Sequence, residues 1–197
     1  THADFLRAEG ELWLDSRPRG AEIRMYRYEQ QARRLVPRRY ATTGPTPVRG
    51  VRVPVGSYVL EVRLQGRTRV RYPVTISRSD PWRPMPPGDR ADYPLRLPAE
   101  GSLHGLERFV PAGWFISGGD PEAVGTLPRQ RLWVDDFCIA ARPVTHQDYL
   151  SFLDALTESG RDEEARSRIS QLPNRLGDDR EPQHVQINGR WCLNRDA

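Results

Sequence analysis

Between residues 10 and 98, hydrophobic and polar residues alternate in short runs. The clearest runs cover residues 51–55, 58–64 and 70–76, and shorter ones cover residues 12–14, 23–28 and 93–97. Successive side chains of a β-strand point to opposite faces, so a period of two predicts half-buried strands. Several short strands separated by turns predict a small β-sandwich or barrel. The arginine-rich stretch up to Tyr40 lacks this period and is expected to be a polar connection. Residues 81–88 are rich in proline and are expected to form a linker or a wide loop. Within them, Trp82 is expected to pack on a neighbouring surface.

After residue 109 the pattern changes. Strands are expected at 132–134 and 137–139, and the period then switches from 2 to 3.6 at Thr145. The apolar positions Tyr149, Phe152, Leu153 and Leu156 form one helical stripe. Thr145 is the expected N-cap of a helix near 146–158, with Asp148 completing a capping box and Gly160 ending the helix. A short polar helix is expected around 162–169, and Asn188-Gly189 predicts a type I′ hairpin between 184–187 and 190–193.

The 197 residues carry a net charge of +4, and every one of the 30 basic residues is arginine. This bias is typical of an arginine-favouring genome. An alternative is the binding of phosphate or an acidic partner, for instance by the Arg33-Arg34 and Arg38-Arg39 pairs, because guanidinium suits planar anions. The 26 interspersed acidic residues weigh against nucleic acid as a partner. Without lysine, this segment has no Walker-type phosphate loop, no kinase β3 lysine and no Schiff-base lysine.

Candidate chemistry is sparse. Cys138 and Cys192 are too far apart in sequence for metal-ligand spacing, and each is expected to be a buried structural residue rather than half of a redox pair. His146 is expected to be a solvated residue of the first helical turn, and the acidic clusters at 135–136, 162–164 and 178–179 to be exposed, although 135–136 could hold a cation. We therefore assign no catalytic, cofactor-binding or metal-binding residue. No apolar run approaches the length of a membrane span, and no secretory signal opens the chain.

Residues 10–98 resemble a PEGA domain. The matching pattern is Gly10-x-Leu12-x-Leu14, Ser16-x-Pro18-x-Gly20-Ala21-x-Ile23, Gly44-x-Thr46-Pro47, Val53-Pro54-x-Gly56-x-Tyr58-x-Leu60-x-Val62 and Gly66. The name-giving Pro-Glu-Gly-Ala stands here as Pro18-Arg19-Gly20-Ala21. The resemblance implies a small β-sandwich.

Residues 109–197 resemble the amino-terminal part of the formylglycine-generating-enzyme (sulfatase-modifying factor) family. The two matching motifs are Pro111-Ala112-Gly113-Trp114-Phe115-Ile116-Ser117-Gly118 and the stretch from Phe137 to Phe152. In the second motif, Pro143 and His146 replace the family's Glu and Asn. The resemblance implies a variant of the C-type lectin fold, covers about a third of a complete family domain, and leaves the family's copper-binding cysteine pair outside this sequence.

The expected organisation is a tail at 1–9, a PEGA-like sandwich at 10–98, a linker at 99–108 and a partial lectin-like domain at 109–197, so that the chain is mainly β with a smaller α+β part. We expect a fragment of a larger bacterial signalling protein, a serine/threonine kinase by family context, acting as a non-catalytic binding region. The alternative is part of a formylglycine-generating oxidase that modifies sulfatases. The expected partners are the rest of the parent chain and a protein or small-molecule ligand. The expected location is the cytoplasm, or the cell envelope if a membrane span lies upstream.

Overall fold

The computed structural model describes residues 8–78, 80–89, 91–169, 171–173 and 180–194. The prediction of a mainly β chain is confirmed, since strands account for 47% and helices for 11% of the residues that the structure describes. The chain divides into two compact units, Thr1–Ala141 and Arg142–Ala197. The domain boundaries at residues 98 and 109 stay predictions, because they rest on family resemblances, which a division of the chain by spatial contacts does not test. Within the described residues, no helix is long and apolar enough to cross a membrane.

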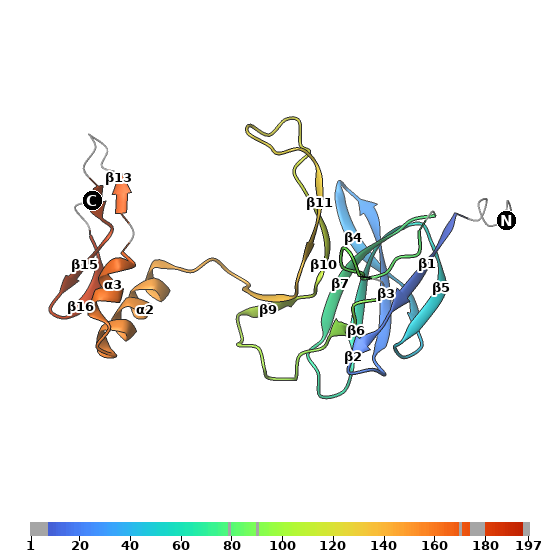
Figure 1. Ribbon diagram of the computed structural model, residues 1–197, viewed down its shortest axis with the longest axis horizontal. Coiled ribbons are helices and arrows are strands. Elements are labelled where there is room, and N and C mark those ends of the chain that lie inside the picture. The colour runs from blue at the N-terminus through green and yellow to red at the C-terminus, as the bar shows by residue number, and fades with distance from the viewer. Residues whose placement is uncertain (1–7, 79, 90, 170, 174–179, 195–197) are drawn as a thin grey trace. The chain divides into compact units, whose positions relative to one another are not determined.

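The first unit is built on a two-layered β-sandwich (Figure 1). One layer is an antiparallel sheet with the strand order β4-β3-β6-β7. Its strands are β3 (Glu22–Gln31), β4 (Arg34–Thr43), β6 (Gly56–Arg63) and β7 (Val70–Ile76). The other layer pairs β1 (Glu9–Leu14) with β5 (Val48–Pro54). Every position between Val51 and Ile76 is strand, turn or loop, which confirms the all-β prediction for this stretch.

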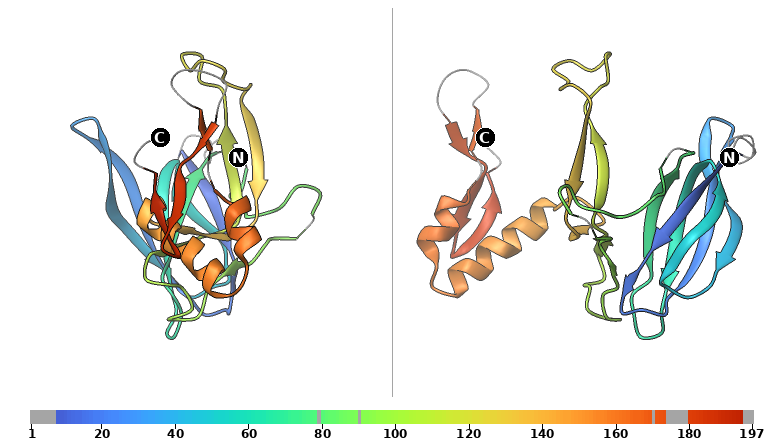
Figure 2. Two further views of the ribbon diagram at one scale, coloured as in Figure 1. Left: turned by 90° about the vertical axis from the view of Figure 1, so that its left-hand side faces the viewer. Right: turned by 45° about the vertical axis from the view of Figure 1, so that its right-hand side comes forward.

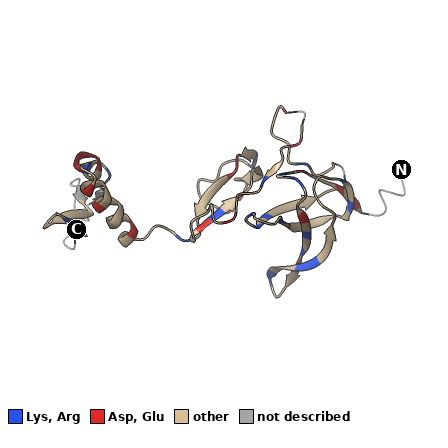
Figure 3. Ribbon diagram, turned by 90° about the horizontal axis from the view of Figure 1, so that it is seen from below, with Lys and Arg blue, Asp and Glu red and all other residues tan. Residues whose placement is uncertain are grey.

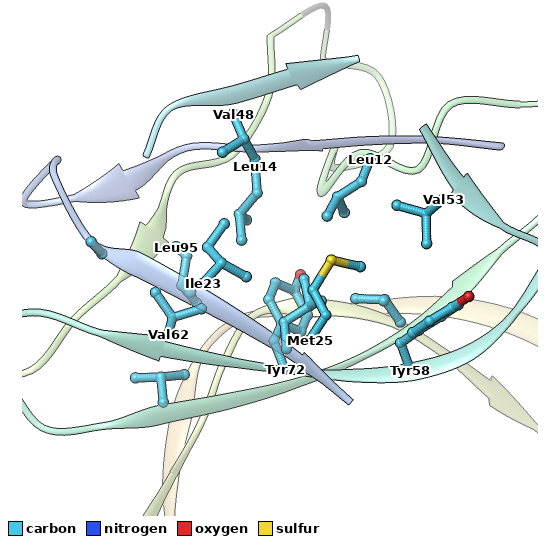
Figure 4. Close-up of a cluster of buried hydrophobic side chains, with 14 of the residues drawn as sticks. Leu12, Leu14, Ile23, Met25, Val48, Val53, Tyr58, Val62, Tyr72 and Leu95 are labelled. Atoms are coloured by element: carbon cyan, nitrogen blue, oxygen red, sulfur yellow. The ribbon is translucent and has the colours of Figure 1, made fainter. Parts of the chain in front are cut away.

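The core lies between these two layers. Figure 4 shows Leu12, Leu14 and Val53 from one layer facing Ile23, Met25 and Tyr58 from the other. The alternation seen in the sequence is therefore the alternation between core and solvent, and β7 shows it without a break from Val70 to Ile76. Each buried side chain of this size contributes about 1.5–3 kcal/mol, so the sandwich has a substantial core of its own.

Two segments of the PEGA-like pattern, residues 16–21 and residue Thr46, are joined by hydrogen bonds at one end of this sandwich. The backbone N–H of Thr46 donates to the Ala21 carbonyl at 2.9 Å, and the N–H of Gly20 donates to the Thr46 carbonyl at 2.9 Å. The buried Thr46 hydroxyl lies 2.5 Å from the Ser16 hydroxyl and accepts from the Ala21 N–H at 3.0 Å. These bonds satisfy buried polar groups and give Thr46 a structural role in the turn region.

The expectation of a polar connection up to Tyr40 is wrong, because residues 34–43 form β4. This strand pairs with β3 and lies at the edge of its sheet, and most of its side chains are exposed. Unlike β7, the other edge strand of this sheet, β4 has no face buried in the core, so it needs no apolar stripe. Charges and proline on an edge strand discourage pairing with other chains. The register places Arg27 directly opposite Arg38, and Pro37 stands opposite Tyr28.

Within residues 81–89 and 91–97, Trp82, Leu95 and Leu97 pack on the sandwich, so this stretch is not a free linker. The backbone of Trp82 donates to Glu11 and accepts from Trp13 at 2.7 and 3.0 Å, and its ring meets that of Tyr72 edge-on at 5.2 Å. The prediction that Trp82 packs on a neighbouring surface is confirmed. The strand expected at 93–97 is the short β8 (Leu95–Arg96), which pairs in parallel with β2 (Ser16–Arg17).

Two antiparallel ribbons complete the first unit. β9 (Glu107–Val110) pairs with β12 (Phe137–Ala140), and β10 (Gly113–Ser117) pairs with β11 (Gln130–Val134). The Tyr72 hydroxyl of β7 donates to the buried Ala112 carbonyl at 2.6 Å, which fixes the start of β10 to the sandwich. Gly118, where β10 ends, has φ +70°, and a Cβ there would lie 2.3 Å from the Leu127 carbonyl oxygen. Only glycine fits so close an approach of two backbones.

The second unit contains both helices of the described chain, α2 (His146–Glu158) and α3 (Asp162–Ser167). They lie beside the hairpin of β15 (His184–Ile187) and β16 (Arg190–Leu193), as Figure 2 shows, and β13 (Gln171–Pro173) pairs with β14 (Arg180–Pro182). The helix predicted near 146–158 is confirmed, with the Thr145–Asp148 capping box in place. Asn188 and Gly189 both have positive φ, as the predicted type I′ turn requires.

Candidate functional site

A small hollow of about 260 Å³ lies where α2 begins in the second unit. Its lining residues are Val144, Thr145, His146, Tyr149, Gln183 and His184. The capping box sets the first turn of α2 and so places His146, while the Asn188-Gly189 turn folds β15 back along β16 and places His184 at the strand start. Two histidines separated by 38 positions thus share one hollow, with ring centres 6.0 Å apart.

His184 is buried, with 2% of its surface exposed. Within the described part of the chain, neither of its ring nitrogens has a hydrogen-bond partner. Its neighbours are the rings of Tyr149, 5.3 Å away between centres, and of His146. The Tyr149 hydroxyl donates instead to the backbone carbonyl of Arg168. Buried polar groups are almost always paired, so this imidazole marks the hollow as a place where a polar partner fits.

Burial lowers the pKa of the His184 imidazole below its ordinary value, and the neighbouring His146 lowers it further. His184 is therefore neutral at pH 7 and holds one N–H donor and one free lone pair. In the first turn of α2, hydrogen bonds from the Thr145 side chain and backbone lower the pKa of the Asp148 carboxyl. The hollow thus holds two imidazoles, and the Asp148 carboxylate in the same helical turn as His146 is engaged in the capping box.

The β10–β11 ribbon of the first unit is apolar on both faces. On one face, Trp114 and Trp133 stand opposite each other and meet edge-on at 5.7 Å, and Trp133 also meets Tyr93. On the other face, Phe115 stands opposite Leu132, with Val134 beside them. These three side chains, which we name the open face, are 46%, 40% and 36% exposed. A ribbon that is solvated on one side normally carries polar residues there.

The β9–β12 ribbon repeats this arrangement. Phe109 packs against the sandwich core and under the Arg96 guanidinium, whereas Phe137 and Ile139 on the other face are exposed. Among the described residues, nearly all of the exposed large hydrophobic side chains lie between residues 106 and 193. The three exceptions are Leu35, Tyr40 and Met85. The apolar surface that lacks cover is thus concentrated in one half of the sequence.

In the second unit the apolar stripe of α2 is covered only in part. Leu153 and Leu156 are buried against Trp191 and Ala165. Trp191 is held by its backbone N–H, which donates to Asp154 at 2.9 Å, and by its indole N–H, which donates to Thr157 at 3.0 Å. Phe152, predicted to belong to the same stripe, is exposed.

The cysteines differ from expectation. Cys138 was predicted to be buried and is exposed, although it stands opposite Phe109 on the face of the ribbon that packs on the sandwich. Cys192 is half-buried on β16, and both thiols are free. Within the described residues, no three His, Cys, Asp or Glu side chains gather as metal ligands would.

The charged clusters singled out in the sequence have ordinary roles. Asp135 accepts from the Trp133 indole at 3.1 Å, and Asp136 pairs with Arg96, so neither is free to hold a cation. His146, Asp162 and Glu163 are exposed, as predicted, whereas Glu164 of the same cluster is half-buried and pairs with Arg161 and Arg168. The cluster at 178–179 lies outside the described residues. The Arg33-Arg34 and Arg38-Arg39 pairs lie on the exposed β3–β4 hairpin, and Figure 3 shows basic and acidic positions interspersed along the strands.

Sequence reasoning missed His184 as a site residue. Its position at the start of a predicted strand carried no local signal, since its burial and its approach to His146 depend on the hairpin folding beside α2. Comparison with protein-family models, with curated proteins and with solved structures found no match to this chain.

Proposed function

We propose that this chain is a non-catalytic binding and interaction region of a larger bacterial signalling protein, and that its 109–197 half is covered by a further polypeptide segment. The observation that carries the proposal is the exposed apolar surface of the β10–β11 ribbon. Phe115, Leu132 and Val134 form the open face, and on the other face Ile116 is 58% exposed beside the half-buried pair of Trp114 and Trp133. Contiguous exposed apolar surface is typical of an interaction site.

The occupant is the downstream part of the same domain. This identification rests on the resemblance to the formylglycine-generating-enzyme family, which covers about a third of a family domain and so implies further segments. The contrast between the two parts of the sequence supports it. The 10–98 sandwich has a closed core, whereas Phe137, Ile139 and Phe152 are exposed in the other half. The parent would be a serine/threonine kinase by family context.

Hydrogen exchange tests the proposal. The 197-residue chain is compared with a chain extended downstream in the parent gene, and exchange is followed in β10, β11 and α2. We expect slower exchange of these elements, by tenfold or more, in the extended chain, because covered strands and helices open less often. The β3, β6 and β7 strands of the sandwich should exchange equally slowly in both.

A pair of leucine substitutions provides the control. Leu132→Asp places a charge on the open face, and Leu35→Asp places the same charge on the exposed β3–β4 hairpin. In the extended chain only Leu132→Asp should return β10 and β11 to fast exchange. Equal protection of β10, β11 and α2 in the two chain lengths would show that this half needs no cover, and the proposal would fail.

A further inference from the structure

The histidine hollow of the second unit has chemistry that the proposed interaction role does not use. His184 is 2% exposed, and in the described part of the chain both its ring nitrogens lack partners. Each nitrogen of an imidazole carries either an N–H donor or a lone pair, and each of these forms a hydrogen bond when a partner is present. A buried ring with neither nitrogen engaged therefore points to a group that enters the hollow from outside.

The second histidine identifies the kind of group. His146 is exposed in the first turn of α2, and its ring centre lies 6.0 Å from that of His184. A metal–imidazole bond of about 2.0–2.1 Å puts the ion about 3.2 Å from the ring centre, so two rings sharing one tetrahedral ion have centres about 5.2 Å apart. The two ring centres are thus within about 1 Å of the spacing of a shared ion, a difference that a small rotation of the exposed His146 side chain can close.

The surroundings suit a cation with open coordination positions. Asp148 provides a carboxylate on the same helical turn as His146, which offsets the positive end of the helix. The amide of Gln183 and the hydroxyl of Thr145 belong to residues that also line the hollow, and its volume of about 260 Å³ leaves room for several waters. Imidazole is a preferred ligand of zinc, copper and nickel, whereas Mg²⁺ and Ca²⁺ prefer oxygen.

We propose that His146 and His184 bind one divalent transition-metal ion of the imidazole-preferring class, such as Zn²⁺, with water in the remaining positions. Two protein ligands make an open site. The ion would join the start of α2 to the start of β15, and so would bring together two elements 38 residues apart. The proposal does not depend on the interaction role, because it uses the ring nitrogens of His146 and His184, and the interaction role invokes neither histidine.

Zn²⁺ itself is the probe, titrated into the 197-residue chain by calorimetry. The competing ligands are removed first by Cys138→Ser, Cys192→Ser and His2→Ala, which leaves three histidines in the background protein. We expect this background to bind one Zn²⁺. His146→Gln, at an exposed position that should fold normally, should weaken binding at least tenfold. His104→Gln, which removes an exposed histidine of the first unit, should leave the affinity unchanged.

A second measurement requires no substitution. Ring proton and nitrogen signals of His146 and His184 should shift together as Zn²⁺ is added, while those of His104 stay in place. Absence of Zn²⁺ binding in the background protein, or equal affinity in His146→Gln and His104→Gln, would overturn the proposal. Shifts confined to His104 would overturn it as well.

Discussion

Tyr72→Phe tests how the ribbon that carries the open face is fixed to the sandwich. The Tyr72 ring lies in the core of the first unit, and its hydroxyl donates to the buried Ala112 carbonyl. Phenylalanine keeps the ring and its edge-on contact with Trp82 but removes the donor. No cavity of consequence forms, so the effect isolates one hydrogen bond between β7 and the segment before β10.

The expected loss is about 1–3 kcal/mol in the free energy of unfolding, because the Ala112 carbonyl stays buried without its partner. Gly113 lies against the same side chain, where an added Cβ would stand 3.2 Å from the Tyr72 hydroxyl oxygen. Small rearrangements that would let water reach the carbonyl are restricted by this close packing, which places the loss toward the upper part of the range.

The same hydroxyl gives a pH dependence. Burial raises the pKa of Tyr72 well above its ordinary value of 10.0. The unfolded chain therefore releases this proton near pH 10 while the folded chain retains it. The stability from Tyr72 is complete below pH 10 and is lost as pH rises further, by about 1.4 kcal/mol per pH unit. The difference between wild type and Tyr72→Phe should shrink over this window.

Urea unfolding followed by tryptophan fluorescence, at pH 8 and at intervals above pH 10, measures both effects. Tyr40→Phe is the matched control, because Tyr40 is 44% exposed and should change stability by less than about 0.5 kcal/mol. If Tyr72→Phe unfolds at the same urea concentration as Tyr40→Phe, and if both keep the wild-type response to alkali, then this hydrogen bond does not anchor the ribbon.

Two further outcomes are expected. Thr145→Ala removes the N-cap acceptor of α2 and should cost about 1 kcal/mol of helix stability, measured by hydrogen exchange in residues 146–158. Ser151→Ala in the same helix is the control and should cost less. Equal effects of the two substitutions would refute a special role for the cap. The chain should not oxidise a sulfatase-derived cysteine peptide in the presence of copper, and turnover that disappears on Cys192→Ser would instead favour the oxidase alternative.

Local rules predicted the elements whose sequence signal is complete within a few residues. The helix at 146–158 needed only its cap and its stripe, and the hairpin at 184–193 needed only Asn188-Gly189. The strands β1 and β7 followed from alternation, because each has one face in the core, whereas β6 is buried on both faces. β4 was missed since it is an exposed edge strand, and an edge strand without a buried face leaves no alternation to read.

The candidate sites were decided at a longer range. The sequence predicted strands at 132–134 and 137–139, but only the pairing of Phe115 with Leu132, and of Trp114 with Trp133, shows which apolar side chains share a face of the β10–β11 ribbon and which of them are exposed. The exposure of Cys138 is likewise visible only in the tertiary structure, because its apolar neighbours in the chain suggested burial. His184 approaches His146 only because the hairpin lies beside α2. Burial and proximity are properties of pairs of segments, whereas periodicity is a property of one, and this is why the sequence determined the strands and helices while the tertiary structure determined the sites.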